Sequence, residues 1–423
     1  MQKFVEKIVL ALRDPMLRAR IIFVFAGLAI FRMMAAIPVP GANAEKLKQF
    51  FESNQLLGLL NVFSGGGFSN LSIVMLGVGP FITASIIMQL MMMLAPKLKS
   101  LYQEEGEAGR QRFGQYTRML TLPLAVIQGA GFLILLERQG IVNHLSPFQF
   151  SLNLIIIAAG ALLVMWLGEL ITEFGIGNGA SLIIFAGIVA AIPTKIAQYL
   201  YGFDQTQIPI LVGFIALAVV VISAVVTITE AERPIPITYA KQVRGNTVKG
   251  GISTYLPLRM TQAGVIPIIF AISILLFPTM LFNLLSYFGN DTVNNIGKMV
   301  NGYLTNNWIY GSLYAVLVFF FTYFYTAVIF DPESIANNLQ KGGAFIPGVR
   351  PGMSTAEYIS NILMRITLVG AFFLAMIAVL PIIVKALTNV QSLVIGGTAL
   401  LIAVSVVLDL IRKIDAQVSM REY

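Results

Sequence analysis

The sequence "GLLNVFSGGGFSNLSIVMLGVGP", residues 58–80, contains two apolar runs of unequal length. Residues 58–63 are apolar enough to enter a membrane, but a helix needs about 20 apolar residues to cross one. Three glycines and a polar Ser-Asn pair follow, and a longer apolar run begins near residue 73. The order predicts a half-helix, a flexible joint and then a full membrane-spanning helix.

The composition of the 423-residue chain is that of a membrane protein. It is 57% hydrophobic and 11% charged, whereas soluble domains carry about 25% charged residues. Cysteine is absent, which excludes disulfides and thiolate metal sites. The single histidine, His144, could not build a histidine-based metal centre. We therefore expect no cofactor and no metal.

Apolar runs predict ten membrane-spanning helices. Their approximate ranges are 21–37, 73–94, 120–136, 152–171, 180–201, 208–229, 263–283, 308–330, 366–384 and 393–410. Of the 28 Lys and Arg residues, 21 fall before the first helix or in every second connection after it, or beyond the last helix. This bias predicts a multi-pass protein of the cytoplasmic membrane with both termini in the cytoplasm.

Two predicted cytoplasmic loops, residues 230–262 and 331–365, are longer than orientation requires. The first contains two β-compatible runs, "IPITYAK" and "TVKGGISTYL", which predict a hairpin. In the second, Asp331 before Pro332 predicts a helix start and Gly342 a helix end. Ser354 and Glu357 have capping-box spacing, which predicts another start. These loops either dock a cytoplasmic partner or only hold orientation, and we favour docking.

No catalytic motif accompanies the spans. The sequence lacks GxxxxGK[ST], HExxH and GxSxG. A secondary solute transporter would carry charged or polar groups at mid-membrane in both halves. We place only Arg32 deep in a predicted span, which argues against a transporter, and no nucleophile–base set favours a membrane-embedded enzyme.

Seven stretches, in order along nearly the whole chain, resemble the SecY family, the channel subunits of the bacterial protein translocase. They are IPVPG, FSGGGFSNLSIVMLGVGPFITASIIMQL, GEAGRQRFGQYTR, MWLGELITEFGIGNGASLIIFAGIV, AGVIPIIFA, GAFIPGVRPG and GGTALLIAVSVVLDL. The resemblance implies an all-α membrane protein with two inverted, pseudo-symmetric five-helix halves around a central pore. The halves would be residues 1–205 and 206–423, with a hinge near residues 201–207.

The same resemblance assigns the half-helix to a plug, from about residue 56 to 70, that closes the resting pore. The glycines would give it a joint; the alternative is an ordinary re-entrant loop. The plug positions are Leu57, Leu60, Phe63, Ser64, Gly65, Gly66 and Gly67.

The family's pore waist is a ring of bulky apolar side chains. Matching the motifs position by position gives Ile82, Ile86, Ile184, Ile188, Ile269 and Val407. The valine departs from the usual isoleucine and loses one methylene. Taken from the sequence alone, such residues would be packing or lipid-facing side chains, and only the resemblance favours a ring.

The resemblance also implies a lateral gate, formed by the second and third helices against the seventh and eighth. Gln89 and Gln262 are polar positions near this gate. One of them would help to hold it closed, or both would bond within one half of the protein.

Partners complete the expectation, because the chain has no nucleotide site of its own. The family works with SecE and SecG, with the motor ATPase SecA or a ribosome (its RNA and proteins), with preproteins that carry signal sequences, and with membrane lipid. We assign motor or ribosome docking to Lys241, Arg244, Lys249 and Arg350, since arginine pairs with carboxylate and phosphate alike. The expected function is a protein-conducting channel that also releases membrane helices into lipid.

Overall fold

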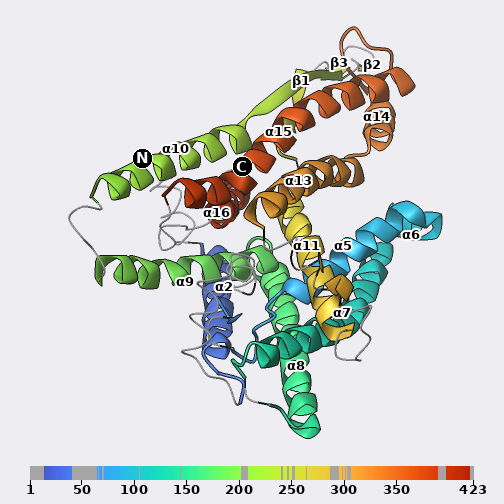
Figure 1. Cartoon of the computed structure of the whole chain (residues 1–423). Helices are drawn as coiled ribbons and strands as arrows, with labels where there is room; N and C mark the ends of the chain where they lie inside the picture. Colours follow the sequence, from blue (N-terminus) through green and yellow to red (C-terminus); the bar gives the residue numbers. More distant parts are fainter. Residues whose placement is uncertain are drawn as a thin grey trace.

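The structure is a computed structural model of the whole chain, shown in Figure 1. It describes residues 14–40, 64, 66–68, 71–103, 105–142, 144–201, 208–239, 242–244, 247–249, 253–262, 264–285, 295–297, 299–300, 302, 306–388 and 397–419.

Each of the ten predicted spans corresponds to a helix within the described residues. These are α2 (Pro15–Ala35), α5 (Gly79–Leu94), α7 (Gly106–Arg138), α8 (Pro147–Phe174), α9 (Gly179–Tyr201), α10 (Ile208–Glu230), α11 (Ile266–Leu285), α13 (Asn307–Ile329), α15 (Met353–Thr388) and α16 (Gly397–Ser419). Two shorter helices, α6 (Pro96–Gln103) and α14 (Pro332–Lys341), lie beside them.

Length and composition alone identify fewer spans than the fold contains. Four described segments are long and apolar enough to cross a membrane: 106–138, 147–174, 308–341 and 353–384. A fifth results if α5 and α6, which meet at a bend of 112°, are counted as one span. Helices α9, α10 and α11 each contribute a shorter apolar stretch.

The second span begins later than the sequence predicts. Residues 71–78 form successive turns, and α5 starts only at Gly79, with Pro80 in its first turn. Gly77 has a φ of 53°, and a Cβ built there would lie 2.6 Å from Ser64 Cα. The apolar run from residue 73 is therefore folded back over Ser64 instead of continuing the helix.

The capping box predicted at Ser354 is wrong. Helix α15 begins at Met353 and runs without a break into the ninth predicted span, so Ser354 already lies inside it. The turn before the helix is held differently: Thr355 Oγ1 donates to the carbonyl of Arg350, 2.9 Å away. Asp331 does cap α14, as predicted, accepting from the backbone N–H groups of Glu333 and Ser334.

The hairpin predicted in residues 230–262 is confirmed. Strands β1 (Glu232–Tyr239) and β4 (Ser253–Arg259) pair antiparallel, and β2 (Gln242–Arg244) pairs with β3 (Thr247–Lys249) beyond them. The sequence does not predict β5 (Ala344–Phe345), which adds to β1 from the other loop. The two loops thus share one apolar core, made of Ile235, Leu258, Ile346, Ile359, Ile362 and Ile366.

The helices form two groups joined by α11. In Figure 1, α2, α5, α7, α8 and α9 lie below, and α10, α13, α15 and α16 lie above. Helix α11 runs between the groups and packs against α13 on one side and against α5 and α7 on the other. The boundary predicted between the halves, at residues 205 and 206, lies outside the described residues.

Candidate functional site

Five of the six predicted ring residues belong to, or pack against, one large apolar cluster. Ile86, Ile184, Ile188 and Ile269 are buried members of one apolar cluster, and Ile82 packs against it. They come from α5 and α9 of the first half of the chain and from α11 of the second half.

Val407 of α16 differs from the other five. It is 38% exposed and lies outside the cluster, whereas Val406 and Ile402 of the same helix belong to it. That these six residues form a ring around a pore stays a prediction.

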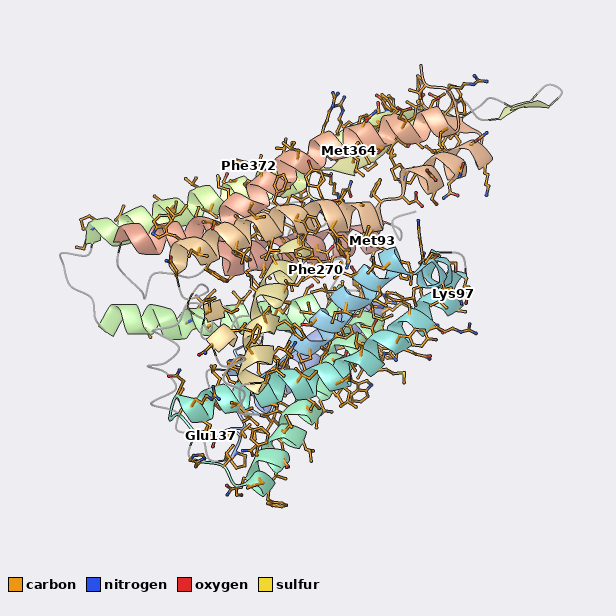
Figure 2. All side chains as sticks on the ribbon, turned by 45° about the vertical axis from the view of Figure 1, so that its right-hand side comes forward. Met93, Lys97, Glu137, Phe270, Met364 and Phe372 are labelled. Atoms are coloured by element: carbon orange, nitrogen blue, oxygen red, sulfur yellow. The ribbon has the colours of Figure 1, made fainter. Side chains whose placement is uncertain are left out.

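The apolar cluster that contains the ring residues is made of aliphatic and aromatic side chains, and Thr83, next to Ile82 in α5, is a buried polar side chain without charge. Phe270, labelled in Figure 2, follows Ile269 and meets Phe321 and Tyr325 of α13 edge-on, at centroid distances of 6.0 and 5.6 Å. These contacts hold the N-terminal part of α11, around Phe270, against α13. Such a collar offers no charge that could hold an ion or a passing side chain.

Part of the predicted plug falls within the described residues. Leu57, Leu60, Phe63 and Gly65 lie outside them; Ser64, Gly66 and Gly67 are described. Ser64 is buried, and its hydroxyl accepts from the backbone N–H of Phe68 at 3.2 Å.

The glycine run ends at an anchored residue. Gly66 has a φ of 85°, which favours glycine, and a Cβ at Gly67 would lie 2.9 Å from the carbonyl oxygen of Val74. Phe68 is fully buried and packs edge-on against Phe132 of α7, with centroids 4.4 Å apart. The residue that follows the glycine run, Phe68, is therefore anchored to α7.

The IPVPG stretch holds the same region from the other side. The N–H of Val39 donates to the carbonyl of Leu71 at 2.7 Å, and that of Ile73 donates to Ile37 at 3.0 Å. We expected Arg32 deep in the first helix, and this prediction is wrong. Arg32 is exposed in the last turn of α2. Its guanidinium lies beside Gly66, 3.2 Å from where a Cβ would be.

The polar residues of the predicted gate do not bond to one another. Gln89 Nε2 donates to Ser85 Oγ of its own helix at 3.1 Å. Among the described residues, Gln89 Oε1 and Gln262 Nε2 are buried with no hydrogen-bond partner. The alternative that bonding stays within one half thus holds for the Gln89 amide.

Sequence reasoning missed a second polar pair beside the gate. Gln128 Nε2 of α7 donates to Thr83 Oγ1 of α5 at 3.2 Å, and both side chains are buried. The sequence could have indicated this pair, because it places a glutamine and a threonine on neighbouring predicted spans.

Three of the four predicted docking residues are described, and Lys241 is not. Arg244 ends β2 and Lys249 ends β3, at the far end of the hairpin. Arg350 is exposed in a turn between Gly348 and Gly352, whose φ angles are 83° and 100°. Strand β5, in the loop that carries Arg350, pairs with β1 of the hairpin, whereas Arg244 and Lys249 lie in the separate sheet of β2 and β3.

Ion pairs of the described residues join charged side chains of α7, α8, α10 and α16 and of the loop at His144. Arg118 Nε contacts Glu169 Oε1 at 2.7 Å, and Arg412 Nη2 contacts Glu230 Oε1 at 2.7 Å. His144 Nδ1 lies 2.5 Å from Glu137 Oε1. No three acidic or histidine side chains of the described residues gather as a metal site would require.

Comparison with known proteins gives one consistent family. The sequence model of the SecY family matches residues 72–411. Protein translocase subunit SecY of Thermotoga maritima is 43% identical over 98% of this chain and 95% of its own length.

Solved structures share the fold. One titled "The structure of a protein conducting channel" has a TM-score of 0.70 at 18% identity, covering 97% of this chain and 94% of that one. Sec61 in the canine ribosome-channel complex has a TM-score of 0.65 at 16% identity, with the same coverage.

Proposed function

The chain belongs to the SecY family of protein translocase subunits, and from this membership we propose that it forms the channel through which unfolded preproteins cross the cytoplasmic membrane. It acts as a channel and not as an enzyme. The same protein releases apolar helices of membrane proteins into lipid through a lateral gate between α5 and α7 on one side and α11 and α13 on the other.

The observation that carries the proposal is the apolar cluster around Ile86, Ile184, Ile188 and Ile269. An unfolded chain must pass while ions do not. A collar of flexible aliphatic side chains adapts to residues of many sizes, and its dryness raises the energy of any ion inside it. Three helices supply these residues, so the collar widens if the helices separate.

The driving force comes from outside, since the sequence has no nucleotide-binding motif. Family membership and the exposed position of Arg350 support docking of the SecA motor or a ribosome on the two long loops, with SecE and SecG as further subunits. A ribosome complex is named for the canine Sec61 structure with the same fold. The bias of Lys and Arg supports a multi-pass protein of the inner membrane with both termini in the cytoplasm.

Site-specific crosslinking tests the pore. The chain has no cysteine, so one cysteine at each of the six ring positions can be compared cleanly. A preprotein stalled during translocation, with a cysteine in its middle, should crosslink to all six. Ile155 and Ile222, which are 66% and 39% exposed, serve as lipid-facing controls.

A parallel variant, Val406→Cys, shows which of the two valines of α16 faces the stalled chain. Equal crosslinking at the ring positions and at the controls would mean that the pore lies elsewhere, and the proposal would fail.

A further inference from the structure

At Gly131, the backbone of α7 lies directly against the backbone of α11. A Cβ built at Gly131 of α7 would lie 2.4 Å from the carbonyl oxygen of Met280 in α11, and 3.1 and 3.3 Å from its C and Cα atoms. Figures 1 and 2 both show one end of α11 resting on α7. Because the obstacle is backbone, no side-chain rotation could make room for a larger residue at Gly131.

The contact lies in an apolar core that belongs otherwise to the first half of the chain. Gly131 is buried, and Phe132, Leu133 and Leu136 of α7 form a cluster with Met280. All its other described buried members lie between Val39 and Ala161. The C-terminal end of α11, at Met280, is thus inserted into the apolar core of the first half of the chain.

A proline lets this end of α11 move separately from the rest. Pro278 lies inside α11, two residues before Met280. It has no N–H to bond the carbonyl of Ile274, so the helix bends readily there. The part before it is fixed by the contacts of Phe270 with α13. The last turns of α11 can therefore leave α7 while Ile269 stays near its place.

We propose that Gly131 sets how closely the seam between α7 and α11 shuts, and that any side chain at this position holds the seam open. This inference rests on the proposed lateral gate and names the residue that determines its closed width. A Cβ reaches ordinary contact at 3.4 Å, so α11 must recede by 1.0 Å, from 2.4 Å, to accept alanine. A valine at position 131 requires a larger displacement of α11.

Spin-label distances in the full chain test the proposal. Gln139 and Leu285 are exposed at the same ends of α7 and α11, and Gln139→Cys with Leu285→Cys gives two labels and no others. With Gly131→Ala, the mean distance in lipid nanodiscs should lengthen by about 1 Å, the shift that restores van der Waals contact. With Gly131→Val it should lengthen further.

Gly129, two residues before Gly131 in α7, supplies the matched control. A Cβ there would meet only side chains of its own half, Leu154 at 3.2 Å and Ile157 at 3.4 Å at the closest. Gly129→Ala and Gly129→Val should leave the label distance unchanged. Equal shifts in both series would overturn the proposal, as would an unchanged distance in Gly131→Ala, which decides the matter if the valine variant does not fold.

Transport assays separate this inference from the proposed function. In proteoliposomes supplied with motor and ATP, Gly131→Ala should pass a preprotein with a defective signal sequence several-fold faster than the unaltered chain does. If the unaltered chain transports normal preproteins and the label distance does not respond to Gly131, only the inference fails. If the unaltered chain transports nothing, the proposed function fails instead.

Discussion

The two halves of the chain meet at two places that are built differently. At the gate seam, Gly131 of α7 lies against the backbone of Met280 in α11. At what we call the terminal seam, apolar side chains from α2, from the turn before α9 and from α16 interlock. The terminal seam consists of Leu17, Ile21, Ile176, Leu410, Ile414 and Val418.

These constructions differ in what separation costs. Leu17, Ile176 and Val418 are 4%, 2% and 8% exposed, and pulling them apart removes close packing that nothing replaces. Near the gate seam, Gln89 Oε1 of α5 and Gln262 Nε2 of the turn before α11 are buried without partners among the described residues. Leaving such atoms unsatisfied costs about 1–3 kcal/mol each, so the closed gate is less favourable than its apolar packing suggests. The difference favours opening at the gate seam over opening at the terminal seam.

The largest effect should come from Leu17→Ala in the terminal seam. Truncating a buried leucine costs about 2–5 kcal/mol, so the thermal unfolding midpoint of the purified protein in detergent should fall by several degrees. Met16 is next to it and 57% exposed, and Met16→Ala should change the midpoint little. Equal shifts for the two variants would show that the terminal seam is no stronger than lipid-facing surface.

An intermediate effect of opposite sign should come from Gln89→Leu. The substitution removes the unpartnered Oε1 but also the bond from Nε2 to Ser85 Oγ. The closed state should gain about 1 kcal/mol net, so single-channel recordings in planar bilayers should show fewer spontaneous openings. Ser85→Ala keeps Oε1 and removes only the bond, so it should act in the other direction. More frequent openings in Gln89→Leu would mean that Oε1 has a partner in the membrane.

The sequence predicts the helices better than it predicts their contacts. Each span follows from a local apolar run, and the cap at Asp331 follows from its neighbours in sequence. The late start of α5 could not be predicted, because residues 71–78 are apolar enough for a helix, and contacts with the distant residues Ser64, Ile37 and Val39 accompany their turns. Strand β5 has two residues and exists only because β1 lies beside it.

The candidate site shows the same limit. Ile82 and Ile86 share a helix face at i,i+4 spacing, which sequence can predict. That α5 packs against α11 depends on long-range contacts, and only the family resemblance led us to expect it. Gly131 was missed because a glycine in a helix costs only about 1 kcal/mol and nothing in the sequence marks the backbone opposite it.

The smallest effect should come from Thr83→Val. This variant tests whether a change within one side of the gate, between α5 and α7, also alters the seam between α7 and α11. Thr83 Oγ1 accepts from Gln128 Nε2 at 3.2 Å and donates to the Gly79 carbonyl at 3.0 Å. Valine keeps the shape and loses the bond that joins α5 to α7. Hydrogen bonds between membrane helices average about 0.6 kcal/mol, so a double-mutant cycle with Gln128→Leu, read by thermal unfolding, should give a coupling of that size. Both helices belong to the same side of the gate, so the label distance between positions 139 and 285 should not change. A longer label distance in Thr83→Val would show that the closed width of the gate seam depends on the hydrogen bond between α5 and α7 as well as on the contact at Gly131. The contrast between a weak gate seam and a strong terminal seam would then have to include α5.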